Sequence, residues 1–217
     1  MKIIETNGIQ YLEQFSHTSD WYWGCDYGCG DLYEAEAVYR DGGTFKPDRL
    51  IFVKYPEGVV YEPVRAEEGQ YIGANPIWMD GMIYFIRVDF PKERIEIFGF
   101  SEVTMTAEVF HTLPLSSVKD CYNLMLHRSP LMLTRQGNDD KLQIIWPEAK
   151  NFSIGNHETF YYRDGDKLFF SNWEEEDEPE YNYWDEVVIR DYHTGKKLDR
   201  YVGSLTAMPN GQNWILK

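Results

Sequence analysis

The sequence predicts an all-β protein, and three observations favour this class. The aromatic residues stand in short runs, Gly, Pro, Asn and Asp separate these runs, and hairpin turns recur along the chain. Aromatic and β-branched side chains favour strands, whereas the separating residues favour turns. With 43% hydrophobic residues among 217, the chain can bury a substantial core. We expect one domain over 1–217 made of short strands, with helix only in a fragment around 115–119.

The C-terminal third contains the clearest unit. Residues 186–216 read as strand, turn, strand, short loop, strand, turn and strand, with four to seven residues in each strand. Asn210 and Gly211 form the dipeptide that is typical of a two-residue type I′ hairpin, because both central positions need positive φ. These residues predict two consecutive antiparallel hairpins.

The turn after the first strand of this unit carries a resemblance. Arg190 and Asp191 stand where WD40 repeats carry a Trp-Asp pair, and residues 194–196 (Thr-Gly-Lys) match the turn that follows that pair. The unit therefore resembles a degenerate WD40 repeat, without the Trp-Asp and Gly-His pairs of that family. The resemblance implies a β-propeller architecture and indicates no specific family.

The hairpin turn of this unit occurs five times. Its positions are Asp41-Gly42-Gly43, Asp80-Gly81, Ser129-Pro130, Asp164-Gly165 and Asn210-Gly211. The successive spacings are 39, 48, 36 and 46 residues, a mean of about 42, which lies in the range of propeller blades. Further strands are expected after these hairpins, at 58–64, 94–100, 107–113, 141–148, 186–191 and 196–202.

The two ends of the chain complement each other. Residues 204–217 form a hairpin without further strands, and residues 1–15 read as two strands around an Asn-Gly turn without an opening hairpin. We therefore predict a small five-bladed propeller closed by pairing of the N- and C-terminal strands, which leaves no long exposed sheet edge. A β-barrel, such as that of lipocalins, or a β-sandwich is the alternative, because both also consist of alternating strands and turns.

Charge and composition exclude several classes of function. A formal net charge of -15, from 21 basic and 36 acidic residues, disfavours nucleic-acid binding. The N-terminus lacks the apolar region of a signal peptide, and no apolar run approaches the roughly 20 residues that span a bilayer. The three cysteines, Cys25, Cys29 and Cys121, suit a reducing compartment. We expect a cytoplasmic protein without membrane contact.

The segment 21–33 is the most unusual in the chain. It combines aromatic residues, glycines, cysteines and aspartates, and such a loop can present flat apolar faces beside carboxylates to a planar ligand or a sugar. The alternative interpretation is that these aromatic residues pack under a loop as part of the core. The candidate ligand-binding residues of the segment are Trp21, Trp23, Asp26, Tyr27, Asp31 and Tyr33.

No motif in the sequence predicts a reaction, a metal or a cofactor. Cys25 and Cys29 with the distant Cys121 make a poor zinc pattern, and the acidic run 174–180 lacks the glycine and spacing of a calcium loop. A nucleophile elbow, a zinc-peptidase motif and a phosphate-binding loop are all missing from the sequence. A run of carboxylates such as 174–180 is most often a solvated loop.

These observations favour a binding module over an enzyme. We expect a non-enzymatic scaffold that recognises a protein or peptide, preferably a basic one, on one propeller face. The alternative is a propeller that binds a small sugar or hydrolyses a glycoside at the ring axis. It would use Trp21, Trp23 or Tyr27 for stacking and two carboxyl groups about 5–10 Å apart for hydrolysis.

Overall fold

A computed structural model describes residues 1–28, 30–73, 75–176, 182–208 and 210–217. The chain divides into two compact units, Met1–Leu126 and His127–Lys217, which are described separately. Both consist mainly of antiparallel strands, so the prediction of an all-β protein is confirmed. The single domain over 1–217 stays a prediction.

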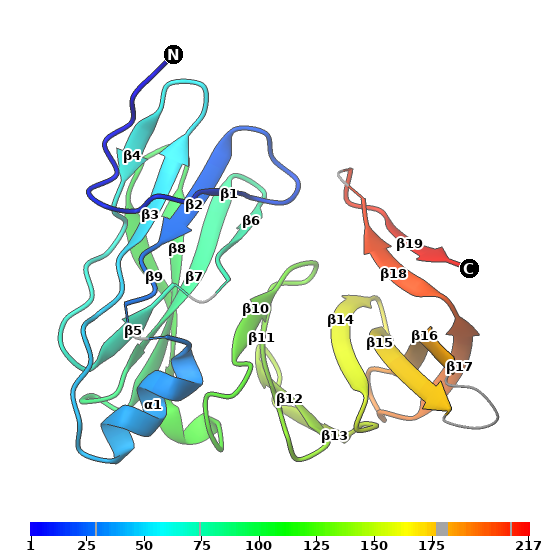
Figure 1. Ribbon diagram of the computed structural model, residues 1–217. Helices are drawn as coiled ribbons and strands as arrows, with labels where there is room; N and C mark the ends of the chain where they lie inside the picture. Colours follow the sequence, from blue (N-terminus) through cyan, green and yellow to red (C-terminus); the bar gives the residue numbers. More distant parts are fainter. Residues whose placement is uncertain (29, 74, 177–181, 209) are drawn as a thin grey trace. The chain divides into compact units, whose positions relative to one another are not determined.

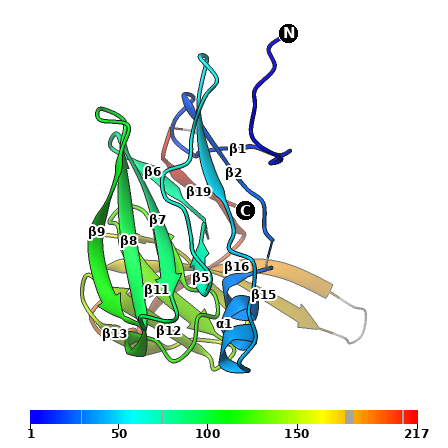
Figure 2. The same cartoon turned by 90° about the vertical axis from the view of Figure 1, so that its left-hand side faces the viewer.

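The first unit contains two sheets, which can be followed in Figures 1 and 2. The four-stranded sheet has the order β1-β2-β3-β4, with β1 (Glu13–Gln14), β2 (Trp21–Cys25), β3 (Leu50–Lys54) and β4 (Val59–Tyr61). The five-stranded sheet has the order β5-β7-β8-β9, and β6 also pairs with β7. Its strands are β5 (Gln70–Ile72), β6 (Ile77–Met79), β7 (Met82–Asp89), β8 (Arg94–Ser101) and β9 (Ala107–Pro114). Helix α1 (Leu32–Arg40) lies between β2 and β3 in the chain, and a short 3-10 helix, η1 (Leu115–Ser117), follows β9.

The second unit continues the same pattern of consecutive antiparallel strands. One sheet has the order β10-β11-β12-β13, with β10 (Met125–His127), which spans the boundary between the units, β11 (Met132–Gly137), β12 (Lys141–Trp146) and β13 (Lys150–Ser153). The next has the order β14-β15-β16-β17, with β14 (Glu158–Asp164), β15 (Lys167–Glu176), β16 (Asn182–Asp191) and β17 (Lys197–Val202). A two-stranded sheet, β18 (Ser204–Ala207) and β19 (Asn213–Leu216), ends the chain.

Most of the predicted hairpins and strands are confirmed. The predicted turns lie between β6 and β7, β10 and β11, β14 and β15, and β18 and β19. The strands expected at 94–100, 107–113, 141–148, 186–191 and 196–202 are β8, β9, β12, β16 and β17. The segment 58–64 contains β4, the fourth strand of its sheet.

The predicted hairpin at Asp41 and Gly42 is wrong, because these residues follow α1. The helix begins with a capping box in which the Asp31 side chain accepts a hydrogen bond from the Glu34 amide. Ala35 and Glu36 of the helix are buried. Both views place α1 beside the end of β5 (Figures 1 and 2). The only helical fragment predicted, at 115–119, is observed as η1.

The predicted pairing of the two chain ends is absent from the described residues. β1 pairs with β2, and β18 and β19 pair only with each other. The N-terminal segment covers one face of the first sheet instead, where Ile4 and Ile9 pack against Ile51 and Val53. Packing on a sheet face removes the apolar surface of these isoleucines from water. Pairing at a sheet edge, which was predicted for this segment, would form backbone hydrogen bonds without requiring that burial. A closed propeller is therefore not shown.

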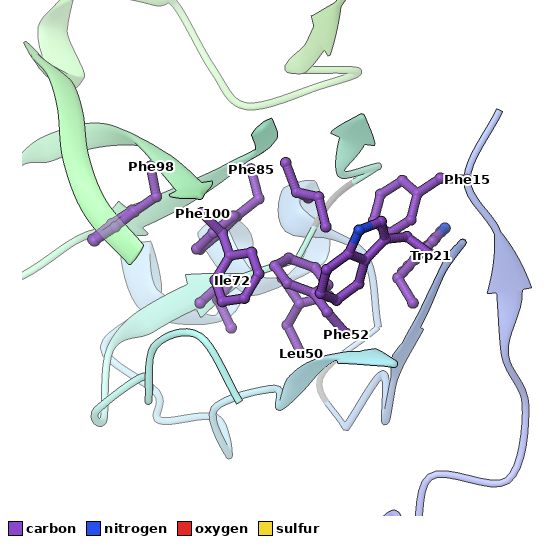
Figure 3. Close-up of a cluster of buried hydrophobic side chains, with 10 residues drawn as sticks. Phe15, Trp21, Leu50, Phe52, Ile72, Phe85, Phe98 and Phe100 are labelled. Atoms are coloured by element: carbon purple, nitrogen blue, oxygen red, sulfur yellow. The ribbon is translucent and has the colours of Figure 1, made fainter. Parts of the chain in front are cut away.

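The core of the first unit lies between its two sheets. Trp21, Leu50 and Phe52 of the first sheet pack in one cluster with Phe85 and Phe100 of the second sheet (Figure 3). The rings of Phe52 and Phe100 meet edge to face, with centroids 5.3 Å apart. Such contacts add to the free energy gained from burial. The first unit therefore has a core of its own.

The second unit also has its own core. Met132, Leu142 and Ile144, from β11 and β12, pack in one cluster with Phe160 and Phe170, from β14 and β15. Side chains two residues apart on a strand point to the same face, so Leu142 and Ile144 face this cluster together. Two of the three sheets of this unit therefore bury apolar faces in a common core.

Candidate functional site

The unusual aromatic segment divides at the end of β2. Trp21 and Trp23 point to the same face of this strand, because side chains two residues apart share a face. They are 0% and 7% exposed, and Trp21 makes an edge-to-face contact with Phe100 at 5.7 Å (Figure 3). Both indoles therefore belong to the hydrophobic core and not to a ligand site.

Asp26 has a local structural role. Its Oδ1 accepts a hydrogen bond of 2.7 Å from the amide of Arg49, and its own amide donates to the Arg49 carbonyl at 3.3 Å. Its second carboxylate oxygen lies 3.7 Å from Nζ of Lys46. These contacts continue the pairing of β2 with β3 beyond the strand ends. Asp26 fixes the start of the loop that leads to the cavity described next.

Tyr27 and residues 30–33 of the segment line a cavity of about 400 Å³ in the first unit. A volume of this size lies in the range of small-molecule and side-chain binding sites, roughly 300–1,000 Å³. Four tyrosines contribute to the wall: Tyr27 and Tyr33 from the predicted segment, and Tyr71 and Tyr122 from elsewhere in the chain. The remaining lining residues are Gly30, Asp31, Leu32, Asn75, Cys121, Asn123, Leu124 and Met125.

The start of α1 positions two of the predicted residues. Asp31 is the N-cap, and its Oδ1 accepts a hydrogen bond of 2.8 Å from the Glu34 amide. Glu34 Oε2 accepts a hydrogen bond of 3.1 Å from the Asp31 amide in return. This reciprocal arrangement satisfies two amides that the first helical turn cannot pair internally. It also fixes the side chains of Asp31 and Tyr33 at the cavity.

The opposite wall is tied to the same helix. Glu36, which is buried, accepts a hydrogen bond of 2.6 Å from the Cys121 amide and lies 2.5 Å from Nη2 of Arg40. The rings of Tyr33 and Tyr122 meet edge to face with centroids 5.1 Å apart. Segment 121–125 is thus held against α1 by one buried charge-assisted hydrogen bond and one aromatic pair.

The backbone around the cavity takes an uncommon conformation at several points. Tyr27, Asn75 and Asn123 have φ values of 44°, 45° and 45°. Asn tolerates the left-handed region, but a bulky tyrosine rarely adopts it. Such conformations cluster at binding sites, where the surrounding structure holds side chains in a fixed direction. Three non-glycine residues with positive φ therefore meet at one cavity.

The two described cysteines are free, buried to different degrees, and protonated at neutral pH. Burial raises the pKa of Cys25 to about 12, and the neighbouring carboxylates of Asp48 and Asp26 add to this effect. Burial also raises the pKa of Cys121, and the negative charge of the nearby Glu36 carboxylate raises it further. Cys29 lies outside the described residues. Within the described ranges, no group of His, Cys, Asp and Glu could hold a metal ion.

The first three residues of the acidic run, 174–176, lie at the end of β15 and not in a loop. Glu174 lies in β15, where its Oε1 accepts hydrogen bonds from Asn172 at 3.0 Å and from Arg200 at 3.3 Å. The rest of the run, residues 177–180, lies outside the described residues. Glu174 is thus engaged in a polar network of the second unit.

Sequence reasoning found three of the six candidate residues at the cavity and missed the others that line it. Tyr27, Asp31 and Tyr33 line it, whereas Trp21, Trp23 and Asp26 do not. Tyr71 and Tyr122 lie about 40 and 90 residues away in the chain, where no local motif distinguishes them. The spacing of Asp31 and Glu34 is a helix-start signal that could have located α1.

No family model matches the chain, and no curated protein matches it. Over the described residues, the structure has no helix of the length and apolarity that a membrane span requires.

Proposed function

We propose that this protein is a non-enzymatic binding module that recognises a segment of a protein or peptide at the tyrosine-lined cavity beside α1. The observation that carries the proposal is the convergence of four tyrosines and three left-handed residues on one cavity of about 400 Å³. The strongly negative chain, with a net charge of -15, favours a basic partner.

The composition of the cavity supports recognition of a peptide. Tyrosine offers a large rigid contact surface with a polar end, and asparagine and glycine offer adaptable hydrogen bonds. Tyr27 and Tyr33 are 54% and 44% exposed, so a partner could cover a large part of each ring. Rigid aromatic anchors of this kind dominate the energetics of many interfaces.

Binding or hydrolysis of a sugar is the second candidate, and one observation supports it. Tyr27 remains exposed and can stack on a sugar ring, although Trp21 and Trp23 are buried. Among the described lining residues, Asp31 is the only carboxylate, whereas glycoside hydrolysis uses a pair. This composition favours sugar binding over cleavage.

The sheets support a propeller as the setting of this site. We propose that the sheets β1–β4, β5–β9, β10–β13 and β14–β17 are blades and that β18–β19 begins a fifth. In the four-stranded sheets each strand pairs with the next one in the chain, which is the construction of a propeller blade, whereas in the β5–β9 sheet both β5 and β6 pair with β7. We retain the cytoplasm as the proposed compartment, because the free thiols Cys25 and Cys121 suit reducing conditions.

The test is selection of binding peptides from a random display library on the full chain. Selected peptides are then measured by calorimetry against Tyr33→Ala/Tyr122→Ala and against Tyr11→Ala. Tyr11 is 84% exposed and does not line the cavity, so it is the matched control. We expect loss of binding in the first variant and unchanged binding in the second. Equal binding to both variants would refute the site.

A glycan array and a panel of chromogenic glycosides test the second candidate. Glycan binding that is lost in Tyr27→Ala, together with failure to select any peptide, would favour sugar recognition over peptide recognition. If no glycan on the array binds and no glycoside is hydrolysed, sugar recognition and cleavage are both excluded.

A further inference from the structure

We infer that the cavity beside α1 binds an organic cation, the ammonium or guanidinium end of an alkyl chain, between Asp31 and the rings of Tyr33 and Tyr122. This inference rests on the proposed function and names the group that the site recognises. A lysine or arginine side chain of a peptide and a free alkylamine share this chemistry.

The charge of the lining selects the sign of the ligand. Of the twelve lining residues described, Asp31 is the only one that is charged at neutral pH, and none is Lys or Arg. An anion would therefore find no cationic side chain in the wall. The buried thiol of Cys121 adds no charge, because burial raises its pKa. The wall as a whole offers one negative charge.

The helix start does not reverse this preference. The N-terminus of a helix attracts anions through its free amides and its dipole. At α1, however, the carboxylates of Asp31 and Glu34 already occupy two of these positions through the capping box. A further anion would meet two negative charges within the first turn. The helix start, of which Asp31 lines the cavity, therefore carries a net negative charge.

Asp31 retains an oxygen for a ligand. Its Oδ1 accepts the hydrogen bond from the Glu34 amide, and Oδ2 accepts none from the residues that the structure describes. Asp31 is also an exposed residue at the cavity wall. An ammonium or guanidinium group that enters the cavity can therefore donate a charge-assisted hydrogen bond to Oδ2 without breaking the cap.

The tyrosines supply the second half of the recognition. Tyr33 and Tyr122 meet at 5.1 Å with an interplanar angle of 74°, so their ring planes are nearly perpendicular and form two sides of a corner. Tyrosine faces attract cations within about 6 Å of the ring centroid. The corner beside a carboxylate suits the charged end of an alkyl chain, whose methylene groups can contact Leu32 and Met125.

The experiment is an NMR titration of the full chain with four small probes. The probes are n-butylammonium, n-butylguanidinium, n-butanol and butyrate, which share an alkyl chain and differ in charge. We expect both cations to shift the amide signals of 31–33 and 121–125, and to bind at least fivefold more tightly than butanol. We expect butyrate to bind more weakly still. Equal affinity for butylammonium and butanol would overturn the inference.

Two variants and one control assign the effect to residues. Asp31→Asn keeps the helix cap, because Asn is as good an N-cap as Asp, and removes the charge. We expect it and Tyr33→Leu each to weaken butylammonium binding by roughly fivefold. Asp41→Asn removes the same charge at the other end of α1, where Asp41 is the C-cap, and should change the affinity by less than twofold. Equal losses in both Asp variants would show a general charge effect and overturn the inference.

Peptides separate this inference from the proposed function. Selected peptides are remade with norleucine in place of each lysine, and citrulline in place of each arginine. Tenfold or greater loss supports the cation inference. Undiminished binding at the cavity overturns the inference while peptide recognition stands. If butylammonium binds but no peptide can be selected, the ligand is a free amine, and the proposed peptide function fails while the cation site stands.

Discussion

The two halves of segment 21–33 have similar composition and different fates. Trp21 and Trp23 on β2 are enclosed between the two sheets of the first unit, whereas Tyr27 and Tyr33 line a cavity open to solvent. The difference follows from the backbone. Alternation along β2 directs both indoles to one buried face. Beyond β2 the chain enters a loop and the first turn of α1, where Tyr27 and Tyr33 remain 54% and 44% exposed.

This comparison shows that an aromatic cluster in a sequence is not one functional feature. An aromatic ring on a strand inside a layered sheet stabilises the fold, and a ring of the same kind a few residues later is available to a partner. The distinction depends on which backbone periodicity each residue follows. Variants in each half separate the stability contribution of the first half from the accessibility of the second.

Truncation of Trp21 has the largest expected effect. Trp21→Ala removes an indole that is 0% exposed and leaves a cavity in the core, so we expect a loss of about 3–5 kcal/mol in the free energy of unfolding. Tyr27→Ala removes a ring that is 54% exposed, so it should change the free energy of unfolding by about 1 kcal/mol or less. Urea unfolding followed by circular dichroism measures both values.

The ratio of the two losses is the informative quantity. If Trp21→Ala and Tyr27→Ala destabilise the protein equally, the two halves do not differ in burial and the comparison is wrong. Trp21→Phe is a second variant that keeps most of the apolar volume. Trp21→Phe should lose less free energy of unfolding than Trp21→Ala does. Such a difference would show that the loss of packing causes the destabilisation.

Cys25, the last residue of β2, marks the boundary between the halves and permits a chemical test. Because burial raises its pKa to about 12, only a small fraction of its thiol is ionised at pH 8. In a Cys29→Ser/Cys121→Ser background, we expect disulfide-exchange reagents to label folded Cys25 about two to three orders of magnitude more slowly than the urea-unfolded chain. Absorbance of the released thiol gives the rate.

The pH dependence gives the sign of this shift. A raised thiol pKa keeps the neutral form in the folded state, so the labelling rate should rise about tenfold per pH unit between pH 7 and 10 without levelling off. The unfolded chain should level off above its ordinary pKa of 9.0. A plateau near pH 9 in the folded protein would place Cys25 in contact with solvent and contradict the boundary.

The strands were predictable because their local sequence pattern is strong. The site was not predictable from the sequence, because it is assembled from distant segments. β8 and β16 each contain a short stretch of β-branched and aromatic residues followed by turn residues, and such stretches indicate strands without knowledge of the fold. Tyr71 and Tyr122 reach the cavity only through tertiary packing, which no spacing along the chain encodes.

Two further differences have identifiable physical causes. The glycines Gly42 and Gly43 favour a hairpin turn and a helix end equally, and only the capping box formed by Asp31 and Glu34 shows that a helix precedes them. The N-terminal strand pattern around Ile9 fits an edge strand as well as a cover over a sheet face. Both errors arose where one local pattern fits two structures.

The smallest expected effect concerns the cap that orients the second half. Asp31→Ala removes the acceptor of the Glu34 amide, which should cost about 1 kcal/mol in the free energy of unfolding, whereas Asp31→Asn should cost a few tenths of that or less. Because the cap also positions Tyr33, Asp31→Ala should shift the amide signals of 32–34 and of Tyr122, its aromatic partner, more than Asp31→Asn does. Urea unfolding and NMR spectra of both variants measure these differences. If the alanine and asparagine variants are equally stable and give equal shifts, the capping box does not hold the cavity wall, and the exposed half of the segment is ordered by the loop alone.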